Sequence, residues 1–135
     1  MKTDSKILIV DDIPKNIQMA MNILKDEGYK MFYAKSGEMA LKLVLEHNFD
    51  LILLDIMMPD MNGFDVCEKL KNDDKTKKIP IVFLSGKDSS QDIEQAYEIG
   101  GVDYVVKPFI TIELITKVNS YVRLKQLEDK FELLG

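Results

Sequence analysis

The stretch LILLDIMMPDMNGFDVCEKL, at residues 51–70, contains one complete strand–helix unit. Its first four residues are all apolar, a pattern that suits a parallel strand covered on both faces better than a half-exposed strand. After a polar loop, apolar residues recur at the spacing of a helix that starts near Gly63: Phe64, Cys67 and Leu70. Asp55 directly follows the apolar run, so we expect its carboxylate at the carboxyl end of a buried strand.

Similar apolar runs and helical segments alternate on both sides of this unit. The expected strands are residues 7–10, 31–34, 51–54, 81–84 and 103–106. Five consecutive β–α units indicate an α/β fold, with a parallel sheet and helices on both faces. Right-handed crossovers leave few topologies, and we expect the doubly wound, flavodoxin-like strand order 2-1-3-4-5. The second and fifth runs are the more polar at their margins, which places them at the sheet edges.

The expected helices follow from apolar spacing and from residues that start or stop a helix. The first helix carries Ile17, Met21 and Leu24 and stops at Gly28, and the second opens at Ser36 and ends near His47–Asn48. The third starts near Gly63. The fourth is capped by Asp88–Ser89, directs Ile93 and Ala96 inward and ends at Gly100–Gly101, and the fifth begins after Pro108.

The last helix is longer than a domain of this size needs. Residues 111–134 contain no Gly or Pro. Beyond Val122 the apolar residues follow the 3-4-3 spacing of a coiled-coil seam: Leu124, Leu127, Phe131 and Leu134. We therefore expect a compact domain over residues 1–122 and a C-terminal helical extension over residues 123–135. The extension leads into a domain that is not present or pairs with a second copy, whereas the helix up to Val122 lies on the sheet.

Bulk properties exclude several classes of protein. The 135 residues fit one domain, and the net charge of -5 with a pI of about 4.9 argues against direct binding of nucleic acid. The single cysteine, Cys67, excludes an intramolecular disulfide and a cysteine-rich metal site. The polar N-terminus lacks the apolar stretch of a signal peptide, and no segment approaches the roughly 18 apolar residues of a membrane span. We expect a soluble, cytoplasmic protein that does not bind membranes.

Polar and charged residues cluster at the expected carboxyl ends of the strands, where parallel α/β sheets bind ligands. These residues are Asp11, Asp12, Asp55, Ser85 and Lys107. Two like charges about 4 Å apart repel by roughly 4 kcal/mol at an effective dielectric near 20. Three carboxylates in one crevice therefore need a compensating interaction that lowers this repulsion. Raised pKa values, Lys107 or a bound divalent cation can supply it, and oxygen ligands suit Mg²⁺ or Mn²⁺.

Four motifs of this sequence resemble those of bacterial response regulator receiver domains, the CheY-like domains of two-component signal transduction. They are ILIVDD at residues 7–12, LLDIMMP with NG at 53–59 and 62–63, FLSG at 83–86, and GGVDYVVKPF at 100–109. Their order and spacing match the family over residues 6 to about 122. The resemblance implies that Asp55 accepts a phosphoryl group from the phosphohistidine of a sensor histidine kinase or phosphotransfer protein. It also implies a signalling phosphoacceptor rather than an enzyme.

The resemblance implies roles for the residues around Asp55. The implied metal ligands are Asp11, Asp12, Asp55 and the backbone carbonyl of Met57. Lys107 is implied to pair first with Asp55 and later with a phosphoryl oxygen, and its peptide bond to Pro108 is implied to be cis. The Ser85 hydroxyl, which replaces the commoner Thr, is implied to hydrogen-bond the phosphoryl group.

A conformational switch is also implied by the resemblance. Ser85 moves toward the phosphoryl group, Tyr104 turns inward, and the surface of the fourth helix, fifth strand and fifth helix changes. A half-buried strand residue is the alternative for Tyr104. The changed surface and the C-terminal helix are both candidate homodimer interfaces. Met57 and Lys87 occupy positions that influence acyl-phosphate hydrolysis in the family, and because an apolar Met does not position water, we expect slow dephosphorylation.

Three other functions fit parts of the pattern. A haloacid-dehalogenase-type phosphatase needs a second acid two residues after the nucleophile, where this chain has Met57. A flavodoxin-like FMN carrier needs hydroxyls and amides in its first loop, where Asp11 and Asp12 repel phosphate. An interaction module that has lost phosphorylation is disfavoured by the complete acceptor set but stays open. Residues 12–16 and the long last helix resemble receivers joined to kinase or cyclic-dinucleotide enzyme domains.

Overall fold

Five short strands form the central sheet of the computed structural model, which describes residues 4–86 and 90–134. They are β1 (Lys6–Val10), β2 (Lys30–Ala34), β3 (Leu51–Asp55), β4 (Ile81–Ser85) and β5 (Asp103–Val106). All neighbouring strands are parallel, in the order β2-β1-β3-β4-β5. The predicted fold class, the strand order and the two edge strands are confirmed. β3 and β4 each continue one residue further than predicted, to Asp55 and Ser85.

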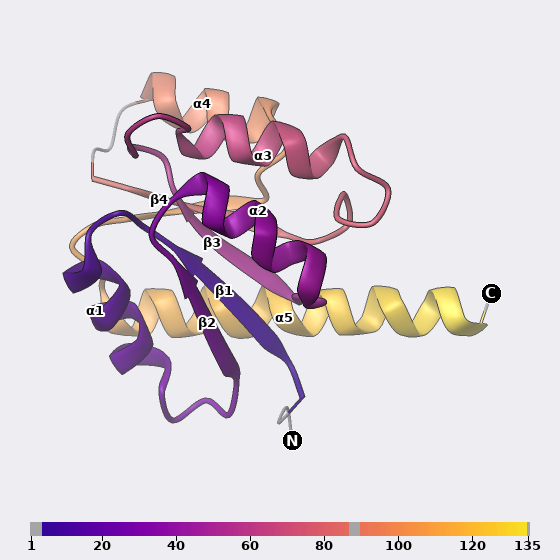
Figure 1. Cartoon of the computed structure of the whole chain (residues 1–135). Coiled ribbons are helices and arrows are strands. Elements are labelled where there is room, and N and C mark those ends of the chain that lie inside the picture. The colour runs from indigo at the N-terminus through magenta and orange to yellow at the C-terminus, as the bar shows by residue number, and fades with distance from the viewer. Residues whose placement is uncertain (1–3, 87–89, 135) are drawn as a thin grey trace.

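Helices cover both faces of this sheet (Figure 1). One face carries α1 (Pro14–Leu24) and α5 (Thr111–Leu134), and the other carries α2 (Gly37–Glu46), α3 (Gly63–Lys71) and α4 (Ser90–Glu98). Burial on both faces explains why β3 and β4 are apolar almost throughout: every residue of both strands is buried.

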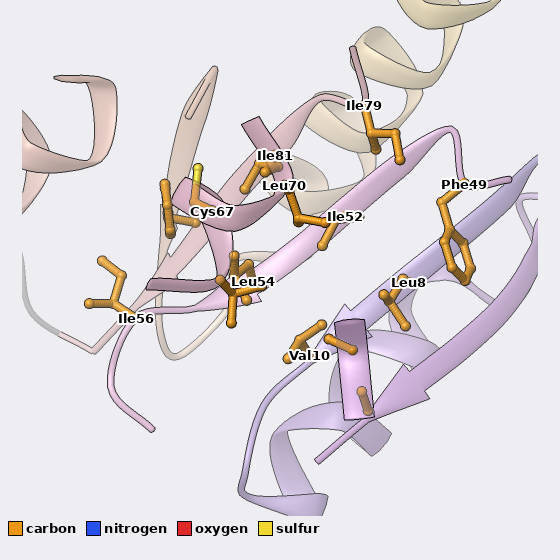
Figure 2. Packing of buried hydrophobic residues seen from close by; sticks show 14 of the residues in the cluster. Leu8, Val10, Phe49, Ile52, Leu54, Ile56, Cys67, Leu70, Ile79 and Ile81 are labelled. Atoms are coloured by element: carbon orange, nitrogen blue, oxygen red, sulfur yellow. The ribbon is translucent and has the colours of Figure 1, made fainter. Parts of the chain in front are cut away.

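Successive side chains of each strand point to opposite faces, so the sheet separates two apolar cores. Leu8, Ile52 and Leu54 pack toward α2 and α3, in the core that Figure 2 shows from close by. Ile9 and Leu53 pack on the other face, toward α1 and α5. Cys67 of α3 is a buried member of the first core, as predicted.

Side-chain caps start two of the helices where the sequence predicted a start. The Ser36 hydroxyl accepts a hydrogen bond from the backbone N–H of Met39 at 3.1 Å. Asn62 and Asp65 form a capping box at the start of α3, with bonds of 2.9 and 3.2 Å. The predicted cap of the fourth helix, at residues 88–89, lies outside the described residues.

The first helix is shorter than predicted, because it ends at Leu24 and not at Gly28. The segment that follows is tied to α5 instead of continuing the helix: Tyr29 donates a hydrogen bond to Asn119, and Asn119 Nδ2 donates to Glu27 Oε1 at 2.9 Å. Gly28, with φ of 87°, supplies the left-handed turn into β2. Partners about 90 residues away thus hold the segment that follows the helix, which local spacing cannot show.

α5 is the longest helix and continues well past the sheet, toward the C-terminal end in Figure 1. The predicted long helix beginning after Pro108 is confirmed in extent, from Thr111 to Leu134. Among the described helices, none combines the length and the hydropathy that a membrane crossing demands.

Gly101, between α4 and β5, has no room for a side chain. A Cβ there would lie 2.6 Å from the Phe83 ring and 2.9 Å from the carbonyl oxygen of Ala96. Gly101→Ala is therefore expected to lower the free energy of unfolding by about 1–3 kcal/mol, measured by urea denaturation. The matched control is Gly86→Ala, because no atom of the described residues lies within 4 Å of its Cβ position; its effect should stay within about 0.5 kcal/mol. Equal effects of the two substitutions would contradict this reading of the packing.

Candidate functional site

The carboxyl ends of three strands bring three carboxylates and one ammonium group together. Asp11 and Asp12 follow β1, Asp55 ends β3, and Lys107 follows β5. One carboxylate oxygen of each aspartate lies within 4.8 Å of the others. We refer to Asp11, Asp12, Asp55 and Lys107 as the acidic site. These residues converge as predicted, because parallel strands end at the same edge of the sheet.

Lys107 is the cation of the acidic site. Its Nζ donates to Asp55 Oδ1 at 3.0 Å and to Asp11 Oδ2 at 3.2 Å. Burial alone would lower the pKa of Lys107, but the hydrogen bonds and charges of Asp55 and Asp11 together raise it above its ordinary value. The ammonium therefore stays charged, and three carboxylates against one cation leave two negative charges uncompensated within the acidic site. The Lys107–Pro108 peptide bond is cis, as expected.

The Asp55 carboxyl has a raised pKa. Its side chain is almost fully buried, and this burial is the main cause that raises its pKa from 3.8 to about 6. The charges of Asp11 and Asp12 add to the increase, whereas the hydrogen bond from Lys107 and the charge of Lys107 oppose it. Asp55 is therefore ionised at neutral pH, but its carboxylate is more basic than that of an exposed aspartate.

The three carboxylates differ in what holds their oxygens. Both oxygens of Asp11 are engaged: Oδ1 accepts from the backbone N–H of Ile13 at 3.0 Å, and Oδ2 accepts from Lys107. Asp12 Oδ1 is buried and has no hydrogen-bond partner within residues 4–86 and 90–134. A buried carboxylate oxygen without a donor, beside two further carboxylates, fits a hard cation that prefers oxygen ligands. The acidic site is therefore a candidate metal site.

The start of α3 packs directly against the backbone of the phosphoacceptor candidate. A Cβ at Gly63 would lie 2.2 Å from the carbonyl oxygen of Asp55, and the Gly63 N–H donates to the carbonyl of Ile56 at 2.9 Å. Sequence reasoning identified Gly63 only as a helix start and missed this contact. Met57 lies in the loop between Asp55 and Gly63, with its side chain 74% exposed.

The two predicted switch residues lie on neighbouring strands. Ser85 ends β4 and is buried. Tyr104 lies on the edge strand β5 and is half-buried; its ring centre is 6.3 Å from that of Tyr97 and 5.4 Å from Lys117 Nζ. Of the two residues expected to influence acyl-phosphate hydrolysis, Met57 lies two residues after Asp55 in the exposed loop, and Lys87 lies outside the described residues.

Asp103 connects α5 with β5 through a network that sequence reasoning did not predict. Its Oδ1 accepts from Lys117 Nζ at 3.2 Å and from the backbone N–H of Tyr104 at 2.7 Å, and its Oδ2 accepts from the Tyr121 hydroxyl at 2.9 Å. Burial and then the bond to Asp103 raise the pKa of Tyr121 to about 12, so this hydroxyl remains a donor. Asp103 lies within the motif at residues 100–109, but local sequence does not reveal its partners, because Lys117 and Tyr121 follow it by 14 and 18 residues.

His47, Cys67 and the lysines of the loop before β4 lie away from the acidic site. His47 is the C-cap of α2, and its ring lies 4.4 Å from that of Phe32, centre to centre. Burial raises the pKa of the Cys67 thiol to about 11, which keeps the thiol protonated and unreactive. The loop lysines at 75, 77 and 78 are exposed.

Comparison with known proteins assigns most of the chain to one kind of domain. Residues 7–119 match the family model of the response regulator receiver domain. A protein of Vibrio cholerae named as a probable cyclic di-GMP phosphodiesterase is 39% identical over 123 residues, which are 91% of this chain and 28% of that protein. The DNA-binding response regulator MtrA of Mycolicibacterium smegmatis is 41% identical over 125 residues, which are 93% of this chain and 53% of MtrA.

Solved structures agree with these sequence matches. The chemotaxis response regulator CheY4 of Vibrio cholerae superposes with a TM-score of 0.82 at 30% identity, covering 88% of this chain and 99% of CheY4. The match therefore covers nearly all of the solved CheY4 chain but only about half, or less, of the length of the two curated relatives.

In cation-free buffer, Asp55→Asn is expected to stabilise the protein at pH 7.5 but not at pH 4. The folded state holds a proton on Asp55 up to about pH 6, whereas the unfolded chain releases it near 3.8. Wild-type stability therefore falls as pH rises through this window, and the variant escapes the loss. The difference in the free energy of unfolding should reach up to about 3 kcal/mol, measured by urea denaturation across pH.

Asp74→Asn is the control for this pH series, because the Asp74 side chain is 95% exposed. Its stability should follow the wild-type pH profile. The assignment would be wrong if the gap between wild type and Asp55→Asn stayed constant from pH 4 to 7.5.

Proposed function

We propose that Asp55 is the phosphoryl acceptor of this chain, which belongs to the response regulator receiver domain family and is therefore a phosphoacceptor of two-component signalling. One observation carries the choice of Asp55. Within the described residues, Asp55 alone combines a hydrogen bond from Lys107, to Oδ1, with a second carboxylate oxygen that accepts from no donor: both oxygens of Asp11 are engaged, and Asp12 accepts nothing from Lys107. Oδ2 of Asp55 thus remains available to bond to phosphorus.

The proposed reaction transfers the phosphoryl group from a phosphohistidine. Oδ2 of Asp55 bonds to phosphorus as the P–N bond breaks, and the imidazole of the donor keeps the electron pair of that bond. The product is an acyl phosphate. Such transfers depend mainly on alignment and on neutralising the charge of the transferring oxygens. Lys107, 3.0 Å from Oδ1, is positioned to shift its hydrogen bond from Asp55 to a phosphoryl oxygen.

Mg²⁺ is the metal ion that we assign to the acidic site, with Mn²⁺ as a substitute of the same ligand preference. The proposed ligands are Asp11, Asp12, Asp55 and the backbone carbonyl of Met57. The buried Asp12 Oδ1 without a hydrogen-bond partner in the described chain supports this assignment. When bound, the ion would neutralise the two uncompensated charges and the charge on the phosphoryl oxygens.

Ser85 and Tyr104 are the proposed switch. A phosphoryl group on Asp55 would attract the Ser85 hydroxyl from the neighbouring strand end, and Tyr104 would turn toward the space that Ser85 leaves. The pairing of Ser85 with Val106 supports this coupling, because it ties the end of β4 to the strand that carries Tyr104. The surface of α4, β5 and α5 would change as a result, because the added charge would shift the equilibrium between two conformations of this region.

The proposed phosphoryl donor is a sensor histidine kinase or a phosphotransfer protein in the cytoplasm. We assign residues 1–122 to the receiver domain and residues 123–135 to a helical extension, supported by a family match that ends at residue 119. For the whole protein, the likeness to a relative named as a cyclic di-GMP phosphodiesterase favours an output on cyclic dinucleotides, although this chain spans only 28% of that relative.

Incubation with acetyl phosphate and Mg²⁺ should add about 80 Da to the chain, the mass of one phosphoryl group, measured by intact mass spectrometry. Asp55→Asn and EDTA-treated wild type should show no addition, because the nucleophile or the neutralising cation is removed. Asp74→Asn, which removes an exposed carboxylate far from the site, should be phosphorylated like the wild type. Phosphorylation of Asp55→Asn would overturn the assignment. So would folded wild type that stays unmodified even with a phosphorylated kinase domain.

The acyl phosphate is expected to last for minutes or longer, because Met57 beside the site offers no group that positions water. Met57→Asn should shorten the lifetime several-fold, measured by the decay of the phosphorylated mass after removal of the donor. Met39→Asn is the matched control, since Met39 is also exposed but lies on α2. A wild-type lifetime of seconds, or no change in Met57→Asn, would contradict the role given to this side chain.

A further inference from the structure

The apolar face of α5 changes sides near residue 123. In the first half of the helix, Leu114, Val118 and Val122 are fully buried and face the sheet. Beyond Val122 the large apolar residues are instead exposed, by between 46% and 88%: Leu124, Leu127, Phe131, Leu133 and Leu134. At about 100° per residue, all of these except Leu133 lie on the side of the helix opposite Val118 and Val122.

Polar contacts hold the inner side of the extension to the domain. Gln126 Nε2 donates to Ser5 Oγ at 2.6 Å, and Lys78 of the loop before β4 forms an ion pair with Glu132. Lys125 and Asp129 pair along the same side at 2.5 Å. The domain therefore contacts the polar side of residues 123–134, while Phe131 and Leu134 stay more than two-thirds exposed and Leu127 stays nearly half exposed. A helix that only ended the domain would place its apolar residues inward.

The exposed residues form a seam with heptad spacing. Leu124 and Phe131 occupy a positions, and Leu127 and Leu134 occupy d positions. The flanking g and e positions are charged, with Arg123 at g and Glu128 at e. We propose that this seam, at residues 123–134, pairs in parallel and in register with the same seam of a second copy of this chain.

The charges of Arg123 and Glu128 beside the seam favour pairing with a second copy in the parallel orientation. In a parallel pair, each g residue faces the e residue five positions later in the partner. Arg123 of one copy then faces Glu128 of the other, and the symmetry repeats this attraction. In an antiparallel pair, g faces g and e faces e, so Arg123 would meet Lys130 and the glutamates would meet each other. Like charges at these positions oppose the antiparallel arrangement.

The other candidate homodimer surface has polar groups that are already engaged within the chain. On the face of α4, β5 and α5, the charges of Asp103 and Lys117 are satisfied by one another at 3.2 Å, and Tyr121 also donates to Asp103. Pairing through those groups would first break bonds within the chain. The extension requires no such loss, because its apolar residues already face solvent.

The seam is short, which sets the expected strength of association. From Leu124 to Leu134 a helix rises only about 15 Å, so the pair should be weak and should form only as the protein concentration rises. In sedimentation equilibrium without any phosphoryl donor, the average mass should climb from the 15.5 kDa of one chain toward twice that value. Leu127→Asp should hold the mass at one chain. Leu45→Asp is the control, because Leu45 is exposed on α2, and it should associate like the wild type.

Charge reversal tests the parallel register. Arg123→Glu and Glu128→Arg should each abolish association, because each creates two like-charge pairs. An equimolar mixture of the two variants should associate again, since positions 123 and 128 then carry opposite charges at both contacts between unlike chains. A chain that stays monomeric to millimolar concentration overturns the proposal, as does association that Leu127→Asp leaves unchanged. Association lost in both single variants but not restored in the mixture overturns the parallel register. None of these results depends on phosphorylation, so they test the seam separately from Asp55.

Discussion

The contact of one ammonium group with two buried carboxylates is the interaction on which the acidic site depends. Two carboxylates about 5 Å apart repel by roughly 3 kcal/mol at an effective dielectric near 20, and this site contains three of them. Lys107 offsets part of that cost by donating to Asp55 and Asp11 together. Because Lys107 directly follows the edge strand β5, the electrostatic balance of the site is tied to the position of that strand. The backbone N–H of Lys107 donates to the carbonyl of Ser85 at 2.7 Å, which fixes the two strand ends together.

The remaining negative charge makes the site responsive. With two charges uncompensated, the site favours either a proton on Asp55 or a divalent cation. Burial is the main cause of the raised pKa of Asp55, and the charges of Asp11 and Asp12 add to it. A cation and a proton therefore compete to neutralise the same negative charge of the acidic site. If Asp55 is phosphorylated as proposed, a dianion would enter the same crevice, and Lys107 would be drawn between Asp55 and the new group. A site that was electrostatically satisfied beforehand would have little to rearrange when the phosphoryl group arrived.

Features that depend on position within a strand or on apolar period could be predicted from the sequence, and those that depend on distant partners could not. Asp11, Asp12 and Asp55 follow apolar runs, so their convergence follows from parallel pairing alone. The segment after the early end of α1 is held by Asn119, far along the chain, and the network of Asp103 depends on two residues of α5. Gly63 looked like a helix start, but its contact with the Asp55 carbonyl exists only after β3 and α3 are packed.

The continuity of α5 gives the extension a mechanical relation to the rest of the domain. Lys117 contacts the Tyr104 backbone carbonyl at 2.8 Å and lies beside Val118, which anchors the helix on the sheet. A change at Tyr104 therefore acts on the helix near its anchor rather than at its end. Leu134 lies 16 residues beyond Val118, about 24 Å along a helix, so a tilt of about 5° moves it by about 2 Å. In a parallel pair the tilt of one copy must be matched by the other, because the seam holds both helices. A conformational change at β5 of one copy would then be transmitted through α5 to the domain of the other copy.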